Sequence, residues 1–205
     1  MPLWRKDNEK VHEIFKLQWG LNIFTLANTG RDFVKTIQDP EQVPVWIENY
    51  RKALSSELAE LVREVRENGM DSPNCKIEIV DMLHFLVSLS HIVGVQPEET
   101  PSFCAAPDGA SFEGCVLNTF LGLDDLQNSV KWKWWAKGGG YKPERARQAI
   151  LALWDSFAAL CALFSLDFET MKRIYIAKNQ VNFSRQKQNY NEDTKTEADN
   201  LTIRT

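Results

Sequence analysis

The chain has 205 residues, of which 43% are hydrophobic and 25% are charged, and its formal net charge is -4. This length and composition predict one globular domain with enough apolar material for a sizeable core. The acidic balance argues against nucleic acid or an anionic membrane surface as the main partner, because both are bound through excess positive charge. We therefore expect no nucleic-acid partner and no membrane partner.

Several features of the chain predict a soluble, cytoplasmic protein. The first residues, Met1 to Lys10, are charged and lack the apolar stretch of a secretory signal. The longest apolar runs, residues 82–95 and 149–166, are interrupted by histidines or by an aspartate and are poor membrane spans. The cysteines show no CxxC spacing, which favours free thiols in a reducing compartment: Cys75, Cys104, Cys115 and Cys161.

Apolar residues recur at helical spacing along nearly the whole chain, whereas the alternation typical of strands is scarce. We predict an all-α helical bundle with helices over residues 8–28, 45–68, 75–93, 112–133, 143–166 and 168–188. The stretch 96–111, rich in Pro, Ala, Gly and Ser, predicts a linker, and the polar stretch 191–205 predicts a flexible tail. A single domain over residues 1–190 would thus have core halves at about 8–95 and 112–188.

The two halves resemble each other weakly. Residues 57–60 can be aligned with residues 125–128, and residues 78–81 with residues 152–155. This alignment suggests a duplicated two-helix unit whose second copy is degenerate and has lost most of its carboxylates. Chance similarity between apolar helices explains the alignment equally well.

Two pairs of carboxylates, Glu57 with Glu60 and Glu78 with Asp81, are each spaced so that both members share one helix face. The second pair is embedded among apolar residues, where unpaired carboxylates are costly unless a cation compensates their charge. Hard oxygen ligands favour Mg²⁺, or else Mn²⁺, over zinc. For the first pair alone, a solvated ion-pairing face is the simpler interpretation. His84 follows Asp81 as in di-iron bundles, but the second half lacks a matching histidine, so a core histidine is favoured.

Near the C-terminus, Lys178, Asn182 and Arg185 fall on one predicted helix face. An ammonium group, an amide and a guanidinium group together suit a polyphosphate, and a solvated basic face is the alternative. The Trp-rich segment 131–137 interleaves indoles with lysines. It either stacks a base beside phosphates or packs at a helix end, and the spacing favours packing.

Four stretches in series resemble motifs of the all-α nucleoside triphosphate pyrophosphatases, and among these the dimeric dUTPases and the phage dCTPase-dUTPases. The first is Leu17-Gln18-Trp19-Gly20-Leu21-Asn22, and the second is the Glu57-xx-Glu60 pair. The third is Glu78-Ile79-Val80-Asp81 with His84-Phe85. The last runs from Tyr175 through Lys178-Asn179, Asn182 and Arg185-Gln186 to Tyr190.

The resemblance implies a role for each matched residue. Four carboxylates would bind Mg²⁺: Glu57, Glu60, Glu78 and Asp81. One of the first pair, Glu60 in preference to Glu57, would orient the attacking water. The side chains near the nucleoside would be Gln18 and Asn22. The remaining substrate contacts would come from the C-terminal stretch: Lys178, Asn179, Asn182, Arg185 and Tyr190. The implied reaction is Mg²⁺-dependent hydrolysis of dUTP to the monophosphate and pyrophosphate in a homodimer, with dCTP as a candidate second substrate.

The chain also departs from the family pattern. The Trp-Lys-x-Trp segment that commonly follows the first carboxylate pair is missing there, and a similar segment stands at residues 131–137 instead. Glycines that usually flank Tyr190 are absent. These departures leave the base-stacking residue and the choice between uracil and cytosine open. Two rival functions therefore stay open: a pyrophosphatase for modified or purine nucleotides, and a non-catalytic helical interaction module.

Overall fold

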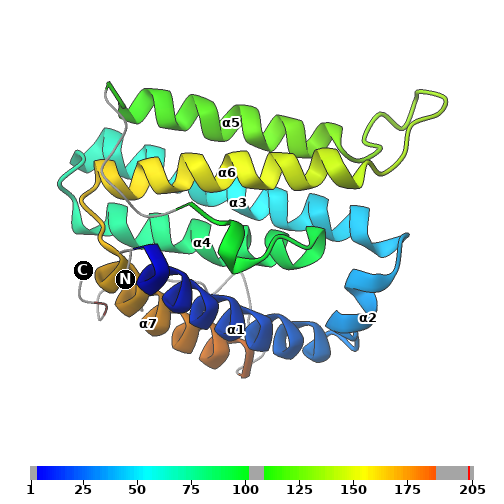
Figure 1. Cartoon of the computed structure of the whole chain (residues 1–205), viewed down its shortest axis with the longest axis horizontal. Helices are drawn as coiled ribbons and strands as arrows, with labels where there is room; N and C mark the ends of the chain where they lie inside the picture. Colours follow the sequence, from blue (N-terminus) through cyan, green and yellow to red (C-terminus); the bar gives the residue numbers. More distant parts are fainter. Residues whose placement is uncertain (1–3, 102–108, 188–202, 204–205) are drawn as a thin grey trace.

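The computed structural model describes residues 4–101, 109–187 and 203. Over these residues the chain forms α-helices and one short 3-10 helix, without a strand, which confirms the predicted all-α fold (Figure 1). The helices are α1 (Trp4–Asn28), α2 (Phe33–Gln38), α3 (Gln42–Asn68), α4 (Pro73–Val93), η1 (Pro97–Glu99), α5 (Phe112–Asn128), α6 (Pro143–Leu163) and α7 (Phe168–Lys187).

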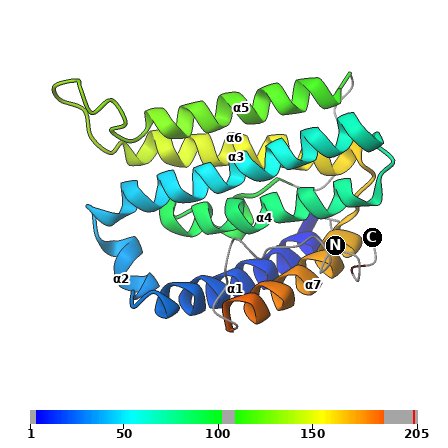
Figure 2. The same ribbon diagram turned by 180° about the vertical axis from the view of Figure 1, so that it is seen from behind.

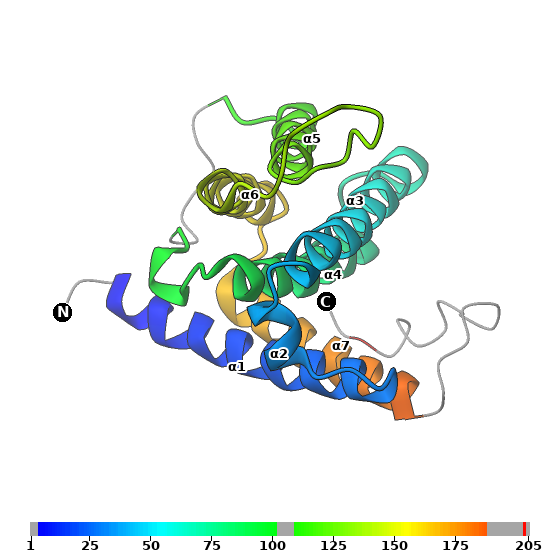
Figure 3. The same ribbon diagram turned by 90° about the vertical axis from the view of Figure 1, so that its right-hand side faces the viewer.

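The long helices are arranged as three neighbouring pairs, α5 with α6, α3 with α4, and α1 with α7 (Figures 1 and 3). Helix α4 is central, because it contacts α3, α6, α1 and α7. Seen from behind, α1 and α7 run side by side along α4 (Figure 2). Helix α4 is accordingly buried over most of its length, and Ile79, Val80, Val87 and Leu89 are fully buried in the apolar core.

A short turn joins α3 to α4 and makes them antiparallel neighbours. Helix α3 ends at Asn68 and is capped by Gly69, whose φ of 83° is accessible to glycine at little cost. Helix α4 then begins with Pro73 in its first turn, where the missing N–H is tolerated. This hairpin brings the carboxylate pair of α3 opposite the pair of α4.

The pair formed by α5 and α6 is packed closely at Gly122. A Cβ atom on this residue would lie 2.8 Å from Leu153 Cδ2 of α6, so any larger residue would force the Leu153 side chain to shift. By length and composition alone, α6 is apolar enough to cross a membrane. In the fold it instead lies between α4 and α5, as a core helix does. The arrangement of two helix pairs leaves the predicted duplication untested.

The sequence analysis missed one helix and was wrong about the end of another and about the packing of two indoles. Helix α2 was missed, because its six residues, capped by the Asp32 side chain, are too short to show helical periodicity. Helix α5 ends at Asn128 instead of continuing to residue 133. The Trp-rich segment therefore lies in the loop before α6, where Trp134 is 84% and Trp135 is 61% exposed. Core packing was thus the wrong interpretation for these two indoles.

The regions predicted as linker and tail fall partly outside the described residues. Within 96–111, the structure describes η1 and the Ser111 N-cap of α5. Of the predicted tail, it describes Ile203 alone. Cys75, Cys115 and Cys161 are buried free thiols, and Cys104 lies outside the described residues.

Candidate active site

A pocket of about 260 Å³ opens where α1, α3, α4 and α7 meet. These helices place most of the sequence-predicted site residues around one space, although the residues are far apart in the chain. The lining residues are Gln18, Leu21, Asn22, Thr25, Tyr50, Glu57, Glu60, Asp81, His84, Phe85, Lys178, Asn182, Arg185 and Gln186.

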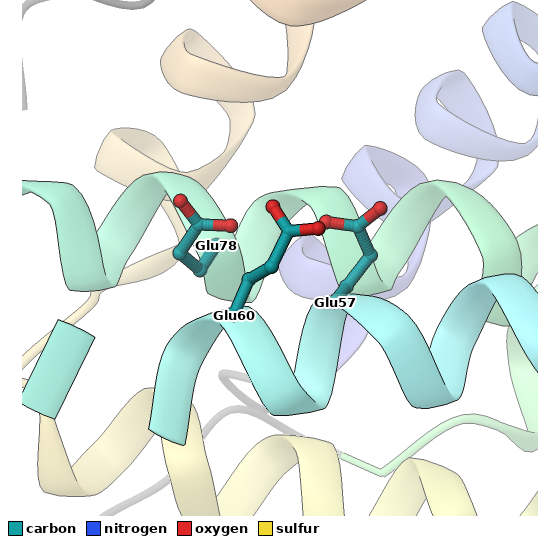
Figure 4. Close-up of side chains that lie close together, drawn as sticks. All are labelled: Glu57, Glu60 and Glu78. Carbon is teal, nitrogen blue, oxygen red and sulfur yellow. The ribbon is translucent and has the colours of Figure 1, made fainter. Parts of the chain in front are cut away.

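Three carboxylates cluster at one side of this pocket. Glu57 and Glu60 rise from α3 toward Glu78 of α4 (Figure 4), and one oxygen from each lies within 4.8 Å of the others. Helical spacing puts Glu57 and Glu60 on the same face, and the antiparallel hairpin supplies Glu78. The cluster is an all-oxygen donor set of the kind that suits a hard divalent cation such as Mg²⁺ or Mn²⁺.

The surroundings of Glu78 disfavour its charged form. Its side chain is buried, and Asn74 Nδ2 donates a hydrogen bond to its Oε1 at 2.8 Å. Burial, followed by the charges of Asp81 and Glu60, raises the pKa of Glu78 to about 7. A cation held among these oxygens would favour the charged carboxylate and so offset the burial and the repulsion that raise this pKa.

Asp81 lies in the same pocket but is engaged differently. Its Oδ2 forms an ion pair with Lys178 Nζ of α7 at 2.7 Å, with side chains 15% and 4% exposed respectively. Such a buried pair is held firmly, because either charge would be costly if left alone. The carboxylate pair predicted on α4 is thus split, with Glu78 in the acidic cluster and Asp81 paired with a lysine.

The basic face predicted on α7 is present at the pocket. Lys178, Asn182 and Arg185 all line it, together with Gln186. Asn179 is buried and is not among the lining residues. Tyr190 lies outside the described residues.

The residues of α1 and α4 form a buried polar network under the pocket. Gln18 Nε2 donates to Asn22 Oδ1 at 2.8 Å and to Ser88 Oγ at 3.0 Å. Gln18 Oε1 accepts from Tyr175 Oη at 2.7 Å and lies 2.8 Å from His84 Nδ1. The His84 ring also stacks on Tyr175, with ring centroids 4.2 Å apart, and burial is the main reason that its pKa falls to about 3.

Sequence reasoning gave no role to several residues of this site: Thr25, Tyr50, Phe85, Ser88 and Tyr175. Two of them could have been found from spacing. Ser88 lies four residues after His84 on α4, and Tyr175 lies three residues before Lys178 on α7, so each shares a face with a residue already singled out. Tyr50 and Thr25 reach the pocket only through the packing of α3 and α1, which no local pattern reveals.

Comparison with known proteins agrees with this geometry. A family model described as dUTPase matches residues 10–190, which include every pocket residue and all three clustered carboxylates. Searches of curated proteins and of solved structures give no significant match. The match covers most of the chain and joins its carboxylate hairpin, its polar first helix and its basic last helix in one family pattern. The chain therefore belongs to the dUTPase family of nucleotide hydrolases.

Proposed function

We propose that the protein catalyses the Mg²⁺-dependent hydrolysis of dUTP to the nucleoside monophosphate and pyrophosphate, with dCTP as the candidate second substrate. One observation carries this proposal. The acidic cluster of α3 and α4 and the basic face of α7 share a single pocket, so that a metal and a triphosphate can be held side by side. Membership of the dUTPase family supports the same substrate class.

We assign the metal to the carboxylates of the hairpin. Glu57, Glu60 and Glu78 would hold Mg²⁺, or alternatively Mn²⁺, with Asp81 as the fourth ligand. When bound, the ion would supply charge compensation for the phosphates and a lowered pKa for water. Glu60, with Glu57 as its neighbour, would orient the attacking water and receive its proton.

The α7 side chains would bind the phosphates. In the structure Lys178 is paired with Asp81, so binding would exchange one anionic partner of this lysine for another. Arg185 and Asn182 would add a guanidinium fork and an amide at the same wall. Contacts from Asn179 and Tyr190 remain predictions from the family pattern.

The proposal is tested with a panel of the eight common nucleotides plus dUTP. Pyrophosphate release is followed by coupling to a pyrophosphatase and detecting phosphate, with Mg²⁺, with Mn²⁺ and with EDTA. We expect turnover of dUTP that requires the metal. Hydrolysis confined to purine or modified nucleotides would instead favour the pyrophosphatase for modified nucleotides. Absence of turnover for every nucleotide would favour the non-catalytic module.

We also propose that the protein is a homodimer. Helix α5 exposes a run of apolar side chains, Leu117, Phe120 and Leu121, each about 60% exposed and thus available for a partner copy. Light scattering at micromolar protein should give twice the mass of the chain, and Phe120→Asp should reduce it to one. A wild-type monomer would contradict the proposal. The cytoplasmic location, and the absence of nucleic-acid and membrane partners, stay predictions.

A further inference from the structure

A further carboxylate of α3, Glu64, lies on the same helix face as Glu60 but has a different set of partners. It follows Glu60 by four residues, a spacing that places both side chains on one face. Its oxygens accept hydrogen bonds from donors at the turn between α3 and α4. Oε1 accepts from Asn68 Nδ2 at 2.9 Å and from Ser72 Oγ, and Oε2 accepts from Asn74 Nδ2 at 3.3 Å. These bonds make Glu64 an anchor for the turn.

The anchor fixes the orientation of the Asn74 amide. The hydrogen bond from Ser72 is the largest cause of the lowered pKa of Glu64, and the bonds from Asn68 and Asn74 lower this pKa further. An ionised carboxylate has no proton to donate and can only accept. Asn74 must therefore turn its NH2 group, and not its carbonyl oxygen, toward Glu64.

Asn74 connects this anchor to Glu78 of the acidic cluster. Its Nδ2 carries two hydrogens, and it donates to Glu78 Oε1 at 2.8 Å as well as to Glu64 Oε2. The bond to Glu78 runs along one turn of α4, whereas the bond to Glu64 crosses to α3. Glu78 is buried and Asn74 is half-buried, which limits the exchange of these bonds with water. One amide group thus bridges two carboxylates on two helices.

The bridge acts on the carboxylate that completes the cluster. Of the three clustered carboxylates, Glu78 alone comes from α4, and Figure 4 shows it facing Glu60 and Glu57 of α3. A glutamate side chain has several rotatable bonds, so holding it in place beforehand removes an entropic cost from ion binding. A carboxylate has about four lone-pair sites, so one hydrogen bond to Oε1 leaves room for an ion. Partners of this kind behind a metal ligand commonly change metal affinity by about tenfold or more.

We propose that Asn74, anchored by Glu64, is a positioning residue that holds Glu78 ready for the divalent cation. The inference rests on the metal assignment of the proposed function and adds the two residues that support one of its ligands. Neither Asn74 nor Glu64 needs to touch the ion, the substrate or the attacking water. The alternative is a turn that merely ties α3 to α4, and such a role would affect folding without changing metal affinity.

The test measures the affinity for Mn²⁺ without nucleotide, from the electron paramagnetic resonance signal of unbound Mn²⁺. Asn74→Ala should raise the Kd by about tenfold or more, because Glu78 loses its support. Asn68→Ala is the matched control. It removes one bond to the same Glu64 carboxylate and none to Glu78, and it should leave the Kd unchanged. Glu64→Ala releases Asn74 from its anchor and should raise the Kd by less than Asn74→Ala does.

Thermal unfolding in EDTA separates positioning from a purely structural role. A variant Asn74→Ala that unfolds at a lower temperature but keeps the wild-type Kd would show a structural turn and overturn the positioning role. If Asn74→Ala does not fold, Glu64→Ala decides the question from the other end of the bridge. A wild-type Kd in Glu64→Ala would overturn the anchor.

The outcomes also separate the inference from the proposed function. Equal Kd values in the wild type and Asn74→Ala, with dUTP hydrolysis by the wild type, would overturn the positioning role alone. A Kd that depends on Asn74 in a protein that hydrolyses no nucleotide would defeat the proposed function and leave the bridge in place. A wild type that binds no Mn²⁺ would overturn the inference. An equal rise of the Kd in Asn68→Ala and Asn74→Ala would overturn it as well.

Discussion

The hairpin of α3 and α4 and the hairpin of α5 and α6 are alike in form and opposite in chemistry. In the first, Glu57, Glu60 and Glu78 point together beside a pocket. At the aligned positions of the second, Asp125 is exposed and pairs with Arg145 at 2.8 Å. Asp155 is exposed as well.

The difference lies in what covers each hairpin. Helices α1 and α7 pack on α4 and enclose the carboxylates, which raises the cost of leaving them uncompensated. Helix α5 has an exposed outer face, so its carboxylates are solvated and need no cation. Acidic residues at helical spacing therefore call for a compensating cation where other helices cover them, and for this reason we propose the metal for the hairpin of α3 and α4 alone.

The largest expected effect is a difference in activity between variants of the two hairpins. Glu57→Gln should lower kcat/KM for dUTP by about a hundredfold or more, because it removes both a proposed metal ligand and a neighbour of the group proposed to orient the attacking water. Asp125→Asn, its counterpart on α5, should stay within about twofold, since it breaks only an exposed ion pair. Steady-state kinetics on both variants checks this. Equal losses of kcat/KM in the two variants would contradict the assignment of catalysis to the hairpin of α3 and α4 alone.

The two hairpins should also differ in how their variants change the stabilisation of the protein by Mg²⁺. Mg²⁺ at about a hundred times its Kd should stabilise the wild type by about 2.7 kcal/mol, measured by thermal unfolding against EDTA. Glu78→Gln should gain little from Mg²⁺. In EDTA at pH 8 it should be more stable than the wild type, because a neutral amide replaces a carboxylate whose pKa is raised to about 7. Asp125→Asn should respond to Mg²⁺ as the wild type does, and a lost response would place the metal elsewhere.

A substitution at Gly122 should lower the stability of the fold and leave the catalytic rate unchanged. Gly122→Leu would force α5 away from Leu153 of α6 and should cost about 1–3 kcal/mol of unfolding free energy. Urea unfolding measures this cost, and kcat of the folded fraction should be unchanged. A large loss of kcat would show that the second hairpin takes part in the site.

The smallest expected effect is on the pH dependence of stability, and it comes from His91, near the C-terminal end of α4, which α1 helps to bury. Burial lowers the pKa of His91, packed edge-on against Phe15 and Trp19, to about 4. The folded state thus binds fewer protons than the unfolded state between pH 6.5 and 4, and stability falls as the pH falls through this range. In His91→Phe, the free energy of unfolding should fall less steeply over this pH range, by on the order of 1 kcal/mol. An unchanged pH dependence of the unfolding free energy would contradict the assignment.

Much of the fold was readable from local sequence patterns. Six long helices were predicted near their observed positions, because each carries an apolar face over several turns. Helix α2 and the end of α5 were not, since a six-residue helix has no period to read and apolar residues at 130 and 132 continue the spacing past Asn128. There the Trp132 indole donates to Asn128 Oδ1 instead of continuing the helix.

The candidate site was predictable only in part. Spacing alone indicated the carboxylates of α3 and α4 and the basic face of α7, whereas Gln18 and Asn22 came from the family resemblance. The pairing of Asp81 with Lys178 was not predictable, because nothing local connects two residues nearly a hundred positions apart. The polar network beneath the pocket was missed for the same reason, since it joins three helices by long-range packing.

The central position of α4 has a consequence for local opening of the chain. Because four other helices cover it, its backbone amides can exchange with solvent deuterium only when most of the core separates. Hydrogen exchange along α4 should therefore report the free energy of global unfolding. The outer helix α5 should exchange through smaller openings. A ligand that binds Glu78 would then slow exchange throughout the core, far beyond the residues it touches.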